Sequence, residues 1–153
     1  MQFSHLIQVT NPSDPEIAPL SREQLWRGLV KRAEKPLHFL FGLDQCQILE
    51  RGPDRMERQL HFGRLVIRDR VTFEPDIQVR YDIEATAESP GGRLVMRIEE
   101  PEAGHLFVRF DYELHVDGGT ANDFYNEFRK SAYVEADIDT VRAIRQLAAD
   151  GWL

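Results

Sequence analysis

The last thirty or so residues constrain the fold of this chain most. Neither proline nor glycine occurs from Thr120 to Asp150. Thr120 and Asp123 have the spacing of a capping box, with Asp in place of Glu, at the start of this interval. Gly151 suits the left-handed residue that ends a helix, and Trp152 can fold back on Leu147. At about 1.5 Å per residue the predicted helix is ~40 Å long or more, which exceeds what a small domain needs for packing.

The apolar residues of this predicted helix form two stripes rather than one. One stripe contains Phe124, Tyr125, Phe128, Ala132 and Ala136, and the other contains Val134, Ile138, Val141, Ile144 and Ala148. So wide an apolar surface predicts contacts on more than one side of the helix. We therefore expect a sheet that curls around the helix, meets it fully at only one end and leaves an apolar hollow between them.

One strand and two short helices are predicted before the main sheet. Residues 3–9 alternate apolar with mostly polar side chains, as a strand does. Ser21 and Gln24 form a capping box for a helix that Lys35-Pro36 ends. Residues 37–42 are predicted as a second, short helix with Pro36 at its first position.

From residue 43 to 114 the apolar period changes to two, which predicts consecutive strands. These strands fall near 44–51, 54–62, 65–73, 77–86, 93–99 and 104–115, separated by short turns rich in glycine and proline. Links this short make consecutive strands antiparallel neighbours. The sequence thus predicts one α+β domain over residues 1–153: a seven-stranded antiparallel curved sheet wrapped around a long C-terminal helix, with two short helices between strands 1 and 2.

Several sequence motifs match a known family. They are residues 20–29 (LSREQLWRGL), 58–63 and 81–84, and Ala132-Tyr133, Thr140-Val141, Ile144-Arg145 and Gly151 near the end. With this order of elements, the chain resembles the helix-grip fold of the START and birch-pollen-allergen superfamily (SRPBCC), and more narrowly the AtaL-like family. The resemblance covers essentially the whole chain and implies a cavity for a small molecule. It transfers no catalytic residue, and the glycine-rich loop of the pollen allergens is not recognisable in this sequence.

The turn at Gly63-Arg64 predicts the register of the strands that flank it. Apolar residues then pair with apolar ones on the inward face, except that Arg58 pairs with Asp69. Extending the pairing across residues 74–76 places Tyr81 beside Asp69. Arg58, Asp69 and Tyr81 then form a polar patch that either binds a ligand carbonyl, phenol or carboxylate or is a structural ion pair.

The predicted cavity wall combines this patch with large apolar side chains. Two of these, Phe39 and Phe41 in the segment after Pro36, are expected to control the entry of a ligand. The wall contains Phe39, Phe41, Arg58, Leu60, Phe62, Ile67, Asp69, Tyr81, Met96, Val108, Phe124, Tyr125 and Phe128.

Other features narrow the class of protein. A net charge of −7 disfavours nucleic-acid and anionic-membrane surfaces, and the first residues lack the pattern of a signal peptide. No cofactor is predicted, and the five histidines lack metal-ligand spacing. The single cysteine, Cys46, fits a reducing compartment, so we expect a cytoplasmic protein.

Three charged residues of the long helix are spaced so that they lie along one line: Glu135, Asp139 and Arg142. Their carboxylates could point into the cavity, but a ladder of ion pairs along the helix explains the spacing more simply.

Three functions remain open from sequence. The first is binding of a small hydrophobic molecule, such as a lipid or a polyketide-like or aromatic metabolite. The second is an enzyme of the same fold, a cyclase or dehydratase, in which Arg58 and Tyr81 polarise a carbonyl while Asp69 or a helix carboxylate moves the proton. The third is a protein-interaction domain. The identity of the ligand and the oligomeric state are not determined by the sequence.

Overall fold

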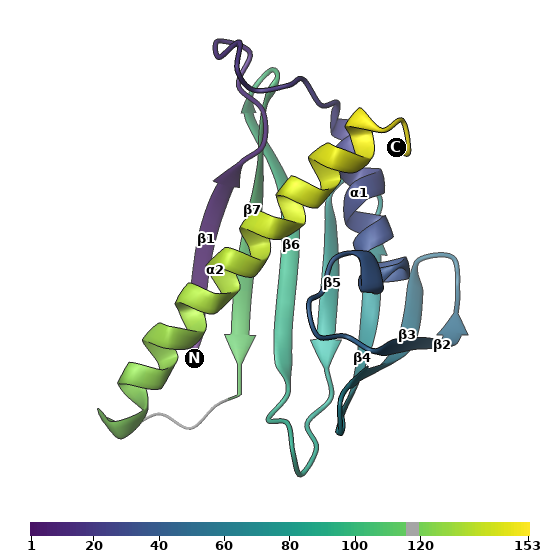
Figure 1. Cartoon of the computed structure of the whole chain (residues 1–153), viewed down its shortest axis with the longest axis vertical. Coiled ribbons are helices and arrows are strands. Elements are labelled where there is room, and N and C mark those ends of the chain that lie inside the picture. Colours follow the sequence, from purple (N-terminus) through teal and green to yellow (C-terminus); the bar gives the residue numbers. More distant parts are fainter. Residues whose placement is uncertain (116–119) are drawn as a thin grey trace.

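The chain folds into one curved antiparallel sheet with two helices on its concave side (Figure 1). The computed structural model describes the backbone of residues 1–115 and 120–153, and the side chains of residues 1–115 and 124–153. The strands are β1 (Gln2–Gln8), β2 (Gln45–Arg51), β3 (Arg55–Phe62), β4 (Leu65–Glu74), β5 (Gln78–Ile83), β6 (Gly92–Glu102) and β7 (His105–Leu114). The strand order β1-β7-β6-β5-β4-β3-β2 confirms the predicted α+β, helix-grip architecture.

Helix α1 (Arg22–Glu34) begins as the sequence predicts. The backbone amide of Gln24 donates to Ser21 Oγ at 3.0 Å, and the amide of Ser21 donates to Gln24 Oε1 at 2.9 Å. This reciprocal pair satisfies two amides that the first turn of a helix cannot satisfy itself.

The predicted second helix over residues 37–42 is wrong. Only a 3₁₀ turn, η1 (Pro36–His38), forms there, with Pro36 at its first position as expected. The segment is short, and Gly42 adopts a positive φ of 82° that no helix continues through. One turn of helix fixes several residues for very few hydrogen bonds, so a segment this short gains too little to extend.

Helix α2 (Thr120–Ala149) confirms the long C-terminal helix and its stop signal. Gly151 has a φ of +78°. Its amide donates to the carbonyl oxygen of Ala148 at 3.1 Å, and the amide of Trp152 donates to the carbonyl oxygen of Leu147 at 2.9 Å. This is the hydrogen-bond pattern of a Schellman motif. The predicted cap by Thr120 and Asp123 lies outside what the structure describes.

Helix α2 packs against the core through side chains of its second half. Asp137, Thr140, Val141 and Ile144 are buried there, whereas Phe128 is 68% exposed. At about 100° per residue, Phe128 lies half a turn of the helix away from Asp137 and so faces the opposite side. In Figure 1, α2 crosses the sheet diagonally and brings its C-terminal end beside α1.

Close packing joins the two helices. A Cβ placed on Gly28 of α1 would lie 2.6 Å from Ile144 Cγ2 of α2, and Ile144 is fully buried. Glycine at this position therefore allows the backbone of α1 to approach α2.

The predicted register is confirmed for one hairpin and wrong for the next. Strands β3 and β4 pair as expected, with Arg58 opposite Asp69. Between β4 and β5, however, Tyr81 pairs with Val71 instead of Asp69. Strand β4 continues to Glu74, so the turn is Pro75-Asp76-Ile77, with Asp76 at a φ of +63°. The error is two residues, an even number, which leaves Tyr81 on the same face of the sheet.

Candidate functional site

Arg58 and Asp69 form a buried ion pair beneath α1. Arg58 Nε lies 2.9 Å from Asp69 Oδ1, and Nη2 lies 2.6 Å from Oδ2. The third guanidinium nitrogen donates to the carbonyl of Ala33, in the last turn of α1, at 2.8 Å. Burial lowers the pKa of Arg58, but the hydrogen bond and the charge of Asp69 outweigh that effect, so the pKa lies above its ordinary value. These bonds are those of a satisfied structural ion pair that anchors α1 to the sheet.

The ring of Tyr81 lies close to two arginines. Its ring centroid is 5.1 Å from Arg58 Cζ and 5.3 Å from Arg32 Cζ. Its hydroxyl is buried and has no hydrogen-bond partner among the described residues. An unsatisfied buried hydroxyl costs about 1–3 kcal/mol, so a further polar group that bonded to this oxygen would stabilise the protein.

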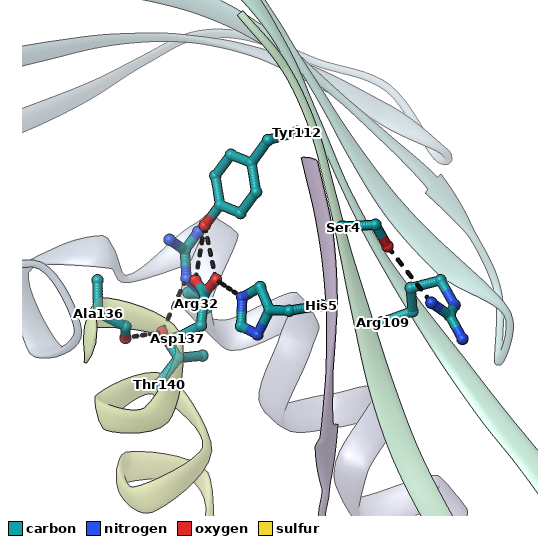
Figure 2. Close-up of polar contacts among 8 residues, drawn as sticks. All are labelled: Ser4, His5, Arg32, Arg109, Tyr112, Ala136, Asp137 and Thr140. Carbon is teal, nitrogen blue, oxygen red and sulfur yellow. Dashed lines mark hydrogen bonds and ion pairs between the residues drawn. The ribbon is translucent and has the colours of Figure 1, made fainter. Parts of the chain in front are cut away.

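A second buried polar cluster joins β1, β7 and α2 (Figure 2). The hydroxyl of Tyr112 shares its proton between the two carboxylate oxygens of Asp137, at 2.8 and 2.7 Å. His5 Nε2 lies 2.6 Å from Asp137 Oδ2. Asp137 is 1% exposed, so this carboxyl group meets the protein rather than water.

Burial shifts the ionisation of this cluster. Desolvation raises the pKa of Asp137 above its ordinary value, although Tyr112, His5 and Arg32 act in the opposite direction. Desolvation, together with the charge of Asp137, also raises the pKa of Tyr112. Tyr112 therefore stays a neutral phenol at physiological pH. Asp137 keeps its proton to a higher pH than an exposed carboxyl, a property useful in acid–base chemistry.

Arg32 of α1 connects the two clusters. Its guanidinium stacks on Tyr81 and donates through Nε to Thr140 Oγ1 at 3.3 Å, its only hydrogen bond within the described part of the chain. Thr140 in turn donates to the carbonyl of Ala136 at 3.1 Å. Arg32 is 7% exposed, and its two terminal nitrogens make no hydrogen bond within the described part of the chain but still reach solvent.

Sequence reasoning missed Arg32, Tyr112 and Asp137, although two of them left a signal. Tyr112 alternates with the apolar Phe110 and Val108 on the inward face of β7. Asp137 lies four and seven residues before Val141 and Ile144, which puts an acid in the apolar stripe that faces the core. Arg32 gave no signal, because an arginine near the end of a helix is ordinary.

The predicted apolar wall is only partly brought together. Leu60, Met96 and Val108 are buried on the concave face of the sheet, and Phe62 and Ile67 are half-buried there. Phe62, Ile67, Ile83 and Leu114 lie towards the same end of this face, and all four are half-buried. That end therefore retains apolar surface in reach of solvent, one inward position beyond Tyr81 on β5.

Four of the predicted wall residues lie elsewhere. Phe124, Tyr125 and Phe128 are 76%, 61% and 68% exposed, and Phe124 and Phe128 lie on the face of α2 turned away from the core. Phe41 is fully exposed in the turn after η1, whereas Phe39 packs against the core. The sequence placed the first aromatic stripe of α2 inside because it could not fix how the helix is rotated about its axis.

Of the four pockets at the surface, only one touches the predicted cavity wall, at Arg58 and Asp69. The four have volumes of about 360, 390, 510 and 410 Å³, and none of the four is lined by Leu60, Met96 or Val108. The pocket that includes Arg58 and Asp69 is lined mainly by charged residues of the outer face of the sheet. Over residues 1–115 and 124–153, no cluster of three or more His, Cys, Asp or Glu could hold a metal ion.

Asp139 and Arg142 form an exposed ion pair along α2 at 2.8 Å, which is one contact of the predicted ladder, whereas Glu135 makes no ion pair with the described side chains. No helix in the described part of the chain combines the length and the apolar character needed to cross a membrane.

Solved structures of low sequence identity share the fold. The di-domain ARO/CYC StfQ from the steffimycin biosynthetic pathway has a TM-score of 0.72 and 11% identity over 97% of this chain. The chain spans 51% of StfQ, about half of its length. The Zhui aromatase/cyclase from Streptomyces sp. R1128 has a TM-score of 0.60 and 16% identity, covering 94% of this chain and 90% of that one. Ara h 8.0201 has a TM-score of 0.61 and 9% identity, covering 98% of each chain.

Comparison with protein families identifies the chain more narrowly than the similar solved structures do. Curated proteins gave no match. The model of the family described as acetylaranotin biosynthesis cluster protein L matches residues 7–151, almost the whole chain. With its helix-grip fold, this chain belongs to that family, AtaL.

Proposed function

We propose that this protein binds a small hydrophobic molecule, aromatic or polyketide-like, at the half-buried apolar end of the concave face, with a ligand oxygen directed at Tyr81 and Arg32. One observation carries the proposal. The Tyr81 hydroxyl is buried without a partner among the described residues, beside a buried arginine that has free donors. A ligand carbonyl or phenol would satisfy both groups, while its apolar part would cover Phe62, Ile67, Ile83 and Leu114.

The names of the matching family and of two similar folds are in keeping with this class of ligand. The family model takes its name from a biosynthesis cluster, and two of the similar folds are aromatase/cyclases by name. The identities of 11% and 16% support the fold alone, so the chemistry of the ligand rests on the residues of this chain.

Binding is tested by mass spectrometry of the gently purified protein and by a panel of apolar fluorescent probes with and without a carbonyl group. Tyr81→Phe removes only the unpartnered hydroxyl and should leave the fold intact. We expect this variant to bind carbonyl-bearing probes about five- to tenfold more weakly, because a hydrogen bond of roughly 1 kcal/mol is lost. Hydrocarbon probes should bind as they do to the wild type. If no probe binds either protein, the proposal fails.

A second candidate is a cyclase or dehydratase acting on the bound molecule. The raised pKa of the buried Asp137, next to His5 and Tyr112, favours it. Arg32 and Tyr81 would polarise a carbonyl, while Asp137 would move a proton. Arg58 is less suited to that role than the sequence indicated, because its three nitrogens are already bonded to Asp69 and Ala33.

Binding and turnover can be separated experimentally. Asp137→Asn should abolish turnover of a polyketide-like test substrate while its affinity changes less than about threefold, since the carboxyl group acts on the proton and not on the docking of the ring. Unchanged turnover in Asp137→Asn would exclude this enzymatic role and leave binding as the function.

A further inference from the structure

One of the four pockets lies between α1, β2 and the residues after α2, and neither Tyr81 nor Arg32 lines it. It has a volume of about 510 Å³, the largest of the four described. One face of α1 supplies Trp26, Val30 and Lys31, strand β2 supplies Ile48, and the residues after α2 supply Trp152. The volume falls within the roughly 300–1,000 Å³ range of small-molecule sites.

Both tryptophans of the chain line this pocket. Trp26 is half-buried against the core, whereas Trp152 is 68% exposed. The Schellman bonds at the end of α2 fix the backbone of Trp152, and its ring lies 5.9 Å from Lys31 Nζ. Two indoles at one pocket, one of them kept largely in solvent, provide flat apolar surfaces suited to an aromatic ring.

The side-chain charges around the pocket favour an anion. Its lining contains the positive Arg27, Lys31 and Lys35 but only one negative side chain, Glu34. Arg27 is paired with Glu23, and Glu34 with Arg51. Neither Lys31 nor Lys35 makes an ion pair with any of the described side chains. Two lysines without an ion pair to a described side chain therefore line the same pocket as the two indoles, and Lys31 Nζ lies over the ring of Trp152, in a protein whose net charge is −7.

We propose that this pocket is a second binding site, and that it takes a small planar aromatic acid. The ring would lie against Trp152 and Trp26, and the carboxylate would lie near Lys31 and Lys35. Pairing the ring with the indoles and the anion with the ammonium groups uses both features of the pocket together. The site is separate from Tyr81 and Arg32, so it does not depend on the function proposed above.

The two tryptophans also make the site easy to observe. In the proton–nitrogen spectrum of the isotope-labelled protein, each indole gives one signal, and both signals report on this pocket. Naphthoate serves as the probe, naphthalenemethanol as the neutral control with the same ring, and decanoate as the anion without a ring. We expect naphthoate to shift both indole signals saturably and to bind about tenfold more tightly than either control.

Two variants test the assigned groups. Lys31→Gln/Lys35→Gln should weaken naphthoate binding about tenfold but leave naphthalenemethanol unchanged, because only the anion loses its partner. Trp152→Leu should weaken both ring compounds, and its stability should hardly change because the side chain is mostly exposed. Tyr81→Phe is the matched control at the other site and should bind naphthoate like the wild type.

Three results would overturn the proposal. The first is the absence of a saturable shift with naphthoate. The second is equal binding of naphthoate by the wild type and the double lysine variant. The third is an indole shift that depends on protein concentration without any probe, which would assign the pocket to contacts between copies of the chain.

Discussion

At the scale of single residues, Arg58 shows how much a buried charge depends on its partners. Arg58 and Asp69 are 2% and 8% exposed, and the bonds from Asp69 and Ala33 engage every nitrogen of the guanidinium. Arg58→Met leaves the Asp69 carboxylate buried and unpaired, so we expect a loss of about 3–5 kcal/mol in the free energy of unfolding, measured with urea. The double variant Arg58→Met/Asp69→Leu should lose less than the single variant. A larger loss in the double variant would contradict the role of Arg58 as the partner of a buried charge.

The carboxyl group of Asp137 is expected to make stability depend on pH. Burial raises its pKa, so the folded protein holds this proton more tightly than the unfolded chain does. The resulting stabilisation is fully present below the unfolded pKa and is lost as pH rises through the raised folded pKa. Asp137→Asn lacks this titration, so the wild type should lose stability relative to the variant as pH rises from about 4 to 8, by ~1.4 kcal/mol for each unit by which the pKa is raised.

Asp139→Asn provides the control for this pH effect. Asp139 lies on the same helix but is exposed, so removing its carboxylate should leave the pH dependence of unfolding close to that of the wild type. Repeating the Asp137→Asn comparison in a His5→Gln background separates the carboxyl from the histidine that contacts it. If the wild type instead gained stability relative to Asp137→Asn as pH rises, the pKa of Asp137 would be lowered by folding rather than raised.

At the scale of elements, the contact between α1 and α2 depends on a missing side chain. Alanine at position 28 would gain roughly 1 kcal/mol of helix propensity, but its Cβ would meet Ile144 Cγ2 at 2.6 Å. We expect Gly28→Ala to be destabilising by about 1–3 kcal/mol in urea unfolding, because overpacking outweighs propensity. Gly28→Ala should cost much less when Ile144→Ala is already present, and equal costs in both backgrounds would show that the two side chains do not meet.

The end of α2 depends on the backbone rather than on packing. Gly151 has a φ of +78°, and nothing lies within 4 Å of the position that its Cβ would take. Gly151→Ala should therefore cost about 1 kcal/mol through left-handed strain alone. The same substitution at Gly63, another positive-φ glycine with no neighbour within 4 Å, should cost a similar amount. A cost near zero at Gly151 would mean that the helix end does not need this conformation.

At the scale of the whole molecule, burial is unevenly distributed along α2. Val141 and Ile144 are buried, whereas Phe124 and Phe128 are mostly exposed. Local opening needs less free energy where little apolar surface is lost. Amide hydrogen exchange should therefore be slower by an order of magnitude or more over residues 140–148 than over 124–132. Equal protection along the helix would contradict this distribution of packing.

Local patterns account for much of what could be predicted. The capping box at Ser21, the stop at Gly151 and the register about Gly63-Arg64 all depend on residues within a few positions of one another. The register of Tyr81 failed because the turn before it depends on Asp76 adopting a left-handed φ, which no short pattern fixed. The prediction of a helix after Pro36 was wrong because a segment of six residues forms too few hydrogen bonds to offset the unfavourable free energy of helix nucleation.

The sequence by itself determined the order of the strands and of the two long helices, the two faces of the sheet, the start of α1 and the end of α2, because these follow from periodicity and from local hydrogen bonds. Only the tertiary structure decided how α2 is rotated about its axis, and therefore that Asp137 faces Tyr112 and His5 while Phe124 and Phe128 face outwards. It also brought Arg32 to Tyr81. Such contacts join residues far apart in the chain, and their geometry depends on the packing of whole helices against the sheet, which a local pattern cannot specify.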